Sequence, residues 1–230
     1  FFWEMMAFAS VFLVWFRRGP QSLAVGYRYL LIHTIGGIIL LAGIMLRYKA
    51  MGNINFDLMD LAHPQLYTWL IMIGFGLNAA MVPLHSWLPE AYSEASFNGA
   101  VFLCAFTTKT AVYTLARACA GMDVLVVLGV IMALYGVIYA VMENDIRKLL
   151  AWSIVSQVGY MVAAVGIGSE MAINGAVAHA VAHILYKSLL FMGTGTVLYL
   201  TGKTKFTELG GLYAKMPLTF LFTLIGCLSI

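Results

Sequence analysis

Three titratable side chains recur at steps of four residues in one apolar stretch of the sequence. His179, His183 and Lys187 therefore share one face of a helix, with a drift of about 40° per step. Histidine titrates near neutrality, and burial can bring a lysine closer to that range. A row of such groups with water molecules between them could pass protons from one neighbour to the next. The row is interpreted as a proton or cation path, because three such groups on one stripe are hard to explain as packing.

Two further charged residues interrupt apolar stretches. Lys109 lies in residues 105–113 (AFTTKTAVY), near the middle of its apolar run, and Glu4 lies beside Trp3 at the start of the chain. A charged side chain at the centre of a membrane helix costs roughly 2.5–3.5 kcal/mol, so such residues mark functional sites by default. Both are therefore candidate path residues, whereas the isolated His33 is interpreted as a structural histidine whose polar atoms are satisfied.

The elements that hold these groups must be membrane helices. The 230 residues are 62% hydrophobic and 10% charged, with a mean hydropathy of +0.91, whereas a soluble domain carries about a quarter charged residues. This composition excludes a soluble enzyme, a nucleic-acid-binding domain and a disordered chain. Open sheet edges cannot exist in lipid, and the sequence lacks the period of two that marks a barrel. The predicted class is an all-α, polytopic transmembrane helical bundle.

A membrane span needs about 20 apolar residues. Eight predicted segments follow from that length: 1–16, 26–47, 67–88, 97–118, 123–142, 148–168, 171–200 and 217–230. Because the first and last segments are incomplete, we expect the chain to be a piece of a longer protein.

The loops between these segments predict an orientation. Alternate loops hold eight basic residues on one side and three on the other, and basic loops lie in the cytoplasm. The eight are Arg17, Arg18, Arg28, Arg147, Lys148, Lys203, Lys205 and Lys215, and the three are Arg47, Lys49 and Arg117. Residues 143–148 (ENDIRK) are interpreted as a cytoplasmic turn whose charges pair in water.

The third segment contains a helix breaker. Pro83 removes a backbone hydrogen bond and clashes with the preceding turn, so we expect this helix to be broken inside the membrane. Interrupted helices can coordinate ions or water through freed backbone groups. Asn78 and His85 flank the proline and are added, with Pro83, as weaker candidates for the path.

The sequence lacks motifs that would predict a bound cofactor or metal ion. Cys104, Cys119 and Cys227 are far apart in apolar runs and are interpreted as small core residues rather than a disulfide or a zinc site. A glycine-rich phosphate loop, a CxxC motif and a Ser-His-Asp set are all lacking. We therefore expect no cofactor, no metal site and no redox centre within the chain.

Four stretches of the sequence resemble the antiporter-like membrane subunits of respiratory complex I, the Mrp cation/proton antiporters and the membrane-bound hydrogenases. They are FWE at 2–4, PLHSWLPEA at 83–91 with SEA at 93–95, DIRKLLAWS at 145–153 with SQVGY at 156–160, and HAVAHILYKSLLF at 179–191. The resemblance covers essentially the whole chain, and the last two stretches are specific.

The resemblance implies a fold of about fourteen helices in two inverted repeats, each with one broken helix. This chain would run from the fifth helix into the twelfth, with residues 1–120 in the first repeat and 121–230 in the second. Glu4 would be the acidic group of the first half-channel and Lys109 the lysine that links the halves. His179, His183 and Lys187 would form the polar axis of the second half.

The sequence departs from the family pattern at two places. Asn78 stands where the family usually has the lysine that pairs with the Glu4-like acid, and Ser96 or a neighbour replaces a usual proline. A neutral amide cannot switch the charge state of the acid. The first half-channel is therefore expected to work differently from the family pattern or to be idle.

These features predict proton translocation, with Na⁺ as an exchanged ion, by one subunit of an Mrp-type antiporter in the cytoplasmic membrane. The expected partners are antiporter-like paralogues, small hydrophobic subunits and the lipid bilayer, and nucleic acid is not one. One alternative is a redox-driven pump subunit of complex I or of a hydrogenase, and only in complex I would the chain count as part of an enzyme. The other is a non-conducting paralogue that holds its neighbours together.

Overall fold

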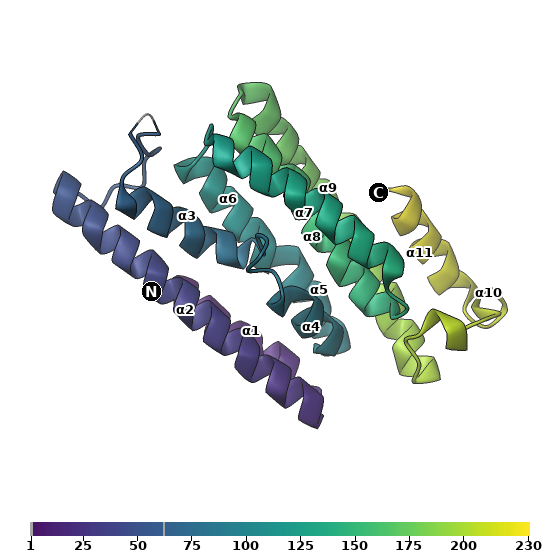
Figure 1. The fold of residues 1–230 in the computed structure, drawn as a ribbon. Helices are drawn as coiled ribbons and strands as arrows, with labels where there is room; N and C mark the ends of the chain where they lie inside the picture. The colour runs from purple at the N-terminus through teal and green to yellow at the C-terminus, as the bar shows by residue number, and fades with distance from the viewer. Residues whose placement is uncertain (1, 62) are drawn as a thin grey trace.

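The computed structural model describes residues 2–61 and 63–230, so Phe1, in the first predicted span, and Ala62 lie outside the described residues. The described part is helical, without a named strand, which confirms the predicted all-α class (Figure 1). The α-helices are α1 (Phe2–Trp15), α2 (Pro20–Met51), α3 (Leu66–Asn78), α4 (Trp87–Glu94), α5 (Phe97–Phe102), α6 (Thr108–Ala118), α7 (Asp123–Met142), α8 (Ile146–Ile167), α9 (Glu170–Thr201), α10 (Leu212–Lys215) and α11 (Pro217–Leu228). A π-helical turn, η1 (Leu103–Thr107), joins α5 to α6, and a 3₁₀ turn, η2 (Phe206–Glu208), precedes α10.

Five helical stretches in the described residues are long and apolar enough to cross a bilayer. They are α2, α7, α8, α9 and the continuous run from α5 through η1 to α6. The shorter apolar helices α1, α3 and α11 occupy the remaining predicted spans. The chain is therefore a multi-pass membrane protein, and the main error of the predicted boundaries is the start of α2. This helix begins at Pro20 rather than residue 26, because proline is well suited to the first position of a helix.

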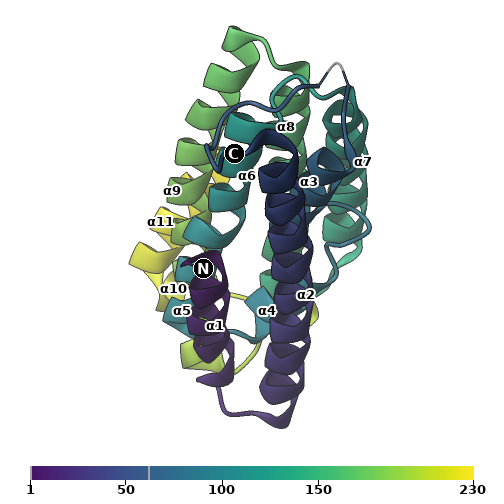
Figure 2. The ribbon, with the colours of Figure 1, turned by 90° about the vertical axis from the view of Figure 1, so that its left-hand side faces the viewer.

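The helices lie side by side from α2 at one edge to α11 at the other (Figure 1), and a perpendicular view places α7 and α9 on opposite sides of the molecule (Figure 2). Contact between α7 and α8 is the most extensive of all helix pairs in the described chain. It depends on small residues, because a Cβ atom on Gly159 would lie 2.6 Å from the Ala133 nitrogen. Such glycines let membrane helices approach backbone to backbone.

The loops predicted to lie in the cytoplasm meet at one end of the bundle. The Phe206 amide donates to the Asn144 carbonyl (2.9 Å), and the Ile146 amide donates to the Thr204 carbonyl (2.9 Å). Ion pairs at that end join Arg17 to Glu94 (3.1 Å) and Arg28 to Glu90 (2.5 Å). The structure thus places these basic loops on one side, as the alternation of the spans requires.

Candidate functional site

The α9 helix carries the predicted row of titratable residues into the bundle. His183 and Lys187 are 0% and 1% exposed, and His179 is half-buried one turn away. The rings of His179 and His183 lie with their centroids 6.1 Å apart, and the His183 ring lies 5.1 Å from that of Tyr186. The spacing of four residues does stack these groups along one side of the helix.

Lys187 has a neutral partner on the neighbouring helix. Its ammonium group donates to the Ser153 hydroxyl on α8 at 2.6 Å, and that hydroxyl donates to the Leu150 carbonyl at 2.8 Å. Ser153 ends the DIRKLLAWS stretch of the sequence. This contact explains why a hydroxyl follows the tryptophan of that stretch.

Lys109 reaches the same interior from α6 and is 7% exposed. Its ammonium group donates to the Cys104 carbonyl at 2.7 Å. Cys104 belongs to η1, where the wider π-helical turn disturbs the regular pattern of backbone hydrogen bonds. In the part of the chain that the structure describes, no carboxylate lies within ion-pair distance of Lys109 or Lys187.

His183 lies one turn after His179 and one turn before Lys187 on α9. Both of its ring nitrogens are buried without a protein hydrogen-bond partner, as are the His179 Nε2 atom and the Tyr186 hydroxyl. Buried polar groups of this kind are usually satisfied by internal water. His179, His183 and Tyr186 together therefore resemble a hydrated polar axis rather than a packed core.

The predicted break in the third segment is present, although it starts before Pro83. Helix α3 already ends at Asn78, and Ala80 takes the left-handed conformation (φ 56°). The Met81 amide donates to the Gly76 carbonyl at 2.9 Å and the Ala80 amide to the Leu77 carbonyl at 3.0 Å. This pair of bonds is the Schellman arrangement that ends helices. The peptide bond before Pro83 is cis, and α4 resumes only at Trp87.

Two further candidates of the first half, Glu4 and Asn78, lie on α1 and at the end of α3. Glu4 is half-buried against Gly37 of α2 and borders a hollow of about 430 Å³ with Trp3 and Thr34. Its Oε1 atom has no protein hydrogen-bond partner, and no basic side chain forms an ion pair with it within the described residues. Asn78 is 2% exposed at the end of α3.

His85 faces the second half of the chain. Its ring lies 4.8 Å from Tyr135 on α7 and 5.5 Å from Trp152 on α8, measured between centroids.

The hydrogen bonding of His33 is only partly satisfied, since Nδ1 bonds the Tyr29 carbonyl at 2.9 Å while Nε2 is buried without a partner. The interpretation of His33 as a satisfied histidine is therefore half correct.

The interpretation of residues 143–148 as a turn with charges paired in water is wrong for two residues. Arg147 is 1% exposed and donates to the carbonyl oxygens of Tyr92 (3.2 Å) and Ala95 (2.9 Å), at the end of α4. Asp145 caps the start of α8 by accepting from the amides of Arg147 and Lys148, and it also accepts from the Thr204 hydroxyl. An aspartate just before an apolar run is a helix-start signal, so the cap was predictable.

Sequence reasoning also missed Tyr92. This residue is fully buried on α4, and its hydroxyl donates to the Leu103 carbonyl of η1 at 2.8 Å. Its ring packs edge-on against Trp87 of α4 and Phe191 of α9. A tyrosine in a short exit motif gives no periodic signal, so only the tertiary contact reveals it.

The three cysteines are free. Cys104 and Cys119 are buried, whereas Cys227 is exposed on α11 and is therefore not the core residue that was predicted.

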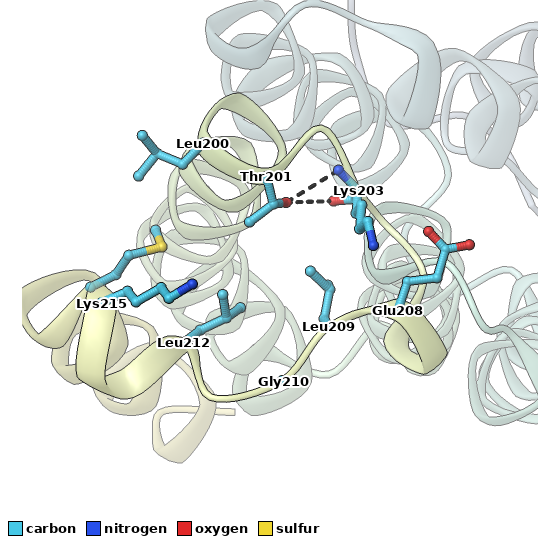
Figure 3. A pocket seen from close by; sticks show the side chains of 9 residues that line it. Leu200, Thr201, Lys203, Glu208, Leu209, Gly210, Leu212 and Lys215 are labelled. Atoms are coloured by element: carbon cyan, nitrogen blue, oxygen red, sulfur yellow. Dashed lines mark hydrogen bonds between the residues drawn. The ribbon is translucent and has the colours of Figure 1, made fainter.

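A hollow of about 500 Å³ lies at the turn between α9 and α11, bordered by Lys203 and Lys215 on opposite sides (Figure 3). It begins at the end of α9, at Thr201, about 21 Å along the helix from Lys187 at 1.5 Å per residue. This hollow is separate from the polar axis and contributes none of its groups.

Comparison with known proteins gives one consistent result. The sequence model of the family described as "NADH:quinone oxidoreductase/Mrp antiporter, TM" matches residues 1–230. Hydrogenase-4 component B of Escherichia coli (strain K12) is 32% identical over 257 residues, which cover 99% of this chain and 38% of the relative. NADH-quinone oxidoreductase subunit N of Desulforudis audaxviator (strain MP104C) is 35% identical over 237 residues, which cover 95% and 47%.

The fold is similar to that of a chain in the structure of the Mrp complex from Dietzia sp. DQ12-45-1b. The TM-score is 0.84 at 27% sequence identity, and the match covers 90% of this chain and 41% of that chain. The chain therefore spans less than half the length of each of these three proteins.

Proposed function

The chain belongs to the NADH:quinone oxidoreductase/Mrp antiporter transmembrane family, and we propose that it carries a proton path within one subunit of a membrane complex. The observation that carries this proposal is the buried set of Lys109, His183 and Lys187. Ionisable groups inside a membrane protein are expensive and mark ion pathways and proton relays. Three buried groups of this kind, with carboxylate partners lacking among the described residues, are not explained as structural ion pairs.

The contacts suit proton transfer. Both lysines donate to neutral acceptors, the Ser153 hydroxyl and the Cys104 carbonyl, so either can release a proton without leaving a carboxylate unpaired. His183 has two free ring nitrogens, so it can accept a proton on one nitrogen and release a proton from the other. Water between these groups would complete the relay.

We further propose that the whole subunit works in the cytoplasmic membrane as part of a cation/proton antiporter with other antiporter-like and small hydrophobic subunits. The similarity to a chain of an Mrp complex supports this assignment. The similarity to a hydrogenase component and to an NADH-quinone oxidoreductase subunit supports the alternative, in which redox chemistry in other subunits drives the pump. A non-conducting paralogue is the third reading, because Asn78 removes the usual lysine.

Substitution of Lys187 tests the proton path. In the full-length protein, assembled in its native complex and reconstituted in vesicles, Lys187→Ala should lower proton transport by about 10²-fold or more, the size typical of a proton-transfer group. A pH-sensitive dye inside the vesicles measures the rate. Lys49→Ala, at an exposed residue near the end of α2, is the matched control and should transport normally. Normal transport by assembled Lys187→Ala would exclude the row as the path.

A further inference from the structure

The helix that carries Lys109 is held by side chains at an irregular turn. Two successive carbonyl groups of η1 are bound by side chains: Leu103 by the Tyr92 hydroxyl at 2.8 Å, and Cys104 by the Lys109 ammonium at 2.7 Å. A π-helical turn differs from an α-helical one by a shift in hydrogen-bond register. A one-residue shift turns the following helix by about 100°, so the register of η1 decides which way Lys109 points.

Tyr92 connects this turn to the broken helix. It belongs to α4, the helix that resumes after the break, and its ring packs edge-on against Trp87 (6.0 Å between centroids) and Phe191 (6.3 Å). The hydroxyl that binds the Leu103 carbonyl is therefore carried by α4.

Arg147 in turn connects α4 to α8. Its guanidinium group donates to the carbonyl groups of Tyr92, in the last turn of α4, and of Ala95, the residue that follows the helix, from a site that is 1% exposed. A cation at the C-terminal end of a helix also interacts favourably with the helix dipole. Arg147 lies at the start of α8, the helix whose Ser153 binds Lys187.

We propose that Tyr92 and Arg147 are positioning residues that set the register of η1 and thereby the direction of Lys109. The proposal rests on the proton path described above and adds a link to it. When α4 shifts relative to α8, Tyr92 releases the Leu103 carbonyl, η1 can adopt α-helical register, and Lys109 turns away from Cys104. The state of the broken helix is then communicated to the lysine between the two halves.

Tyr92→Phe tests this link because it removes the hydroxyl and keeps the ring. In the full-length protein in its native complex, we expect transport to fall several-fold, the effect of one lost hydrogen bond. We also expect the thiol of Cys104, which is buried inside η1, to react faster with a small membrane-permeant maleimide. Cys119, buried at the end of α6, is the internal reference and should not change. Cys227→Ala in all variants removes the exposed thiol.

Arg147 provides the second comparison. Arg147→Met should raise Cys104 labelling in the same way, and Arg147→Lys, which keeps one cationic donor, should restore part of the protection. Tyr160→Phe, at an exposed tyrosine of α8, is the control for loss of a hydroxyl. Unchanged Cys104 labelling in Tyr92→Phe, or equal increases at Cys104 and Cys119, would overturn the proposal.

The labelling result does not depend on transport. A complex in which the unaltered chain transports no protons would contradict the proposed function, while Cys104 labelling would still report whether Tyr92 sets the register of η1.

Discussion

The buried lysines are notable for the partners they have. Lys187 donates to a hydroxyl and Lys109 to a backbone carbonyl, and the described ion pairs lie at the end of the bundle that holds the basic loops instead. Breaking a buried ion pair leaves an uncompensated charge, which costs about 3–5 kcal/mol. Neutral acceptors avoid that cost when a proton leaves. The residue chemistry of the second half therefore favours repeated protonation and deprotonation.

The candidate residues of the first half of the chain differ in chemistry from the buried lysines. Glu4 has no basic partner among the described residues, and Asn78 is a neutral amide at the end of α3. We therefore predict that Glu4→Gln lowers transport less than about twofold, whereas Lys187→Ala lowers it by about 10²-fold or more, in the same vesicle assay. A loss as severe as that of Lys187→Ala would show that the carboxylate still acts.

Helix geometry places these residues in two different ways. In α9, a regular helix, the spacing of four residues alone aligns His179, His183 and Lys187. In the α5–η1–α6 span and at the break between α3 and α4, irregular turns decide where Lys109 and His85 point. Irregular backbone at membrane depth is tolerated where protein surrounds it and side chains satisfy it. The Trp87 indole does this at the break by donating to the Leu77 carbonyl at 3.1 Å.

Close packing of α7 against α8 fixes the position of the helix that carries Ser153. Gly159→Leu should destabilise the protein by at least ~1–3 kcal/mol, since overpacking costs that much even where only side chains collide. The measurement is the midpoint of thermal unfolding in mild detergent. Gly175→Leu on α9 is the matched control, because a Cβ atom there meets nothing within 4 Å. Equal stability of the two variants would contradict the role assigned to Gly159.

At the scale of the whole molecule, the two predicted halves meet through several elements. Contacts cross from α4 to α8, from α5 and η1 to α9, and from α6 to both α8 and α9, in the middle of the arrangement shown in Figure 1. The division into repeats at residues 1–120 and 121–230 remains a prediction.

The exposed ion pair between Arg28 and Glu90 adds about 0–1 kcal/mol at most to stability, so apolar and glycine packing hold the bundle together.

The companion subunits distinguish an antiporter complex from a redox-driven pump. We predict that the full-length protein, purified in mild detergent and examined by native mass spectrometry, retains membrane subunits that include an antiporter-like paralogue. A set without flavin, iron–sulfur or nickel subunits is expected for a gradient-driven antiporter. Stoichiometric redox subunits would instead establish the pump alternative and exclude the antiporter assignment. A chain with no stable companion would contradict both.

Some of this protein was determined by its sequence alone. Apolar runs long enough for a bilayer dictate helices, and the step of four residues puts His179, His183 and Lys187 on one face, because both depend only on local geometry. The buried state of Arg147 was decided by tertiary structure, since it binds carbonyl groups of Tyr92 and Ala95. So was the hydroxyl of Tyr92 on η1, because it joins residues 11 positions apart across a helix boundary. Hydrogen bonds between distant segments leave no periodic trace in a sequence, so only the packed bundle shows which carbonyl groups need a partner.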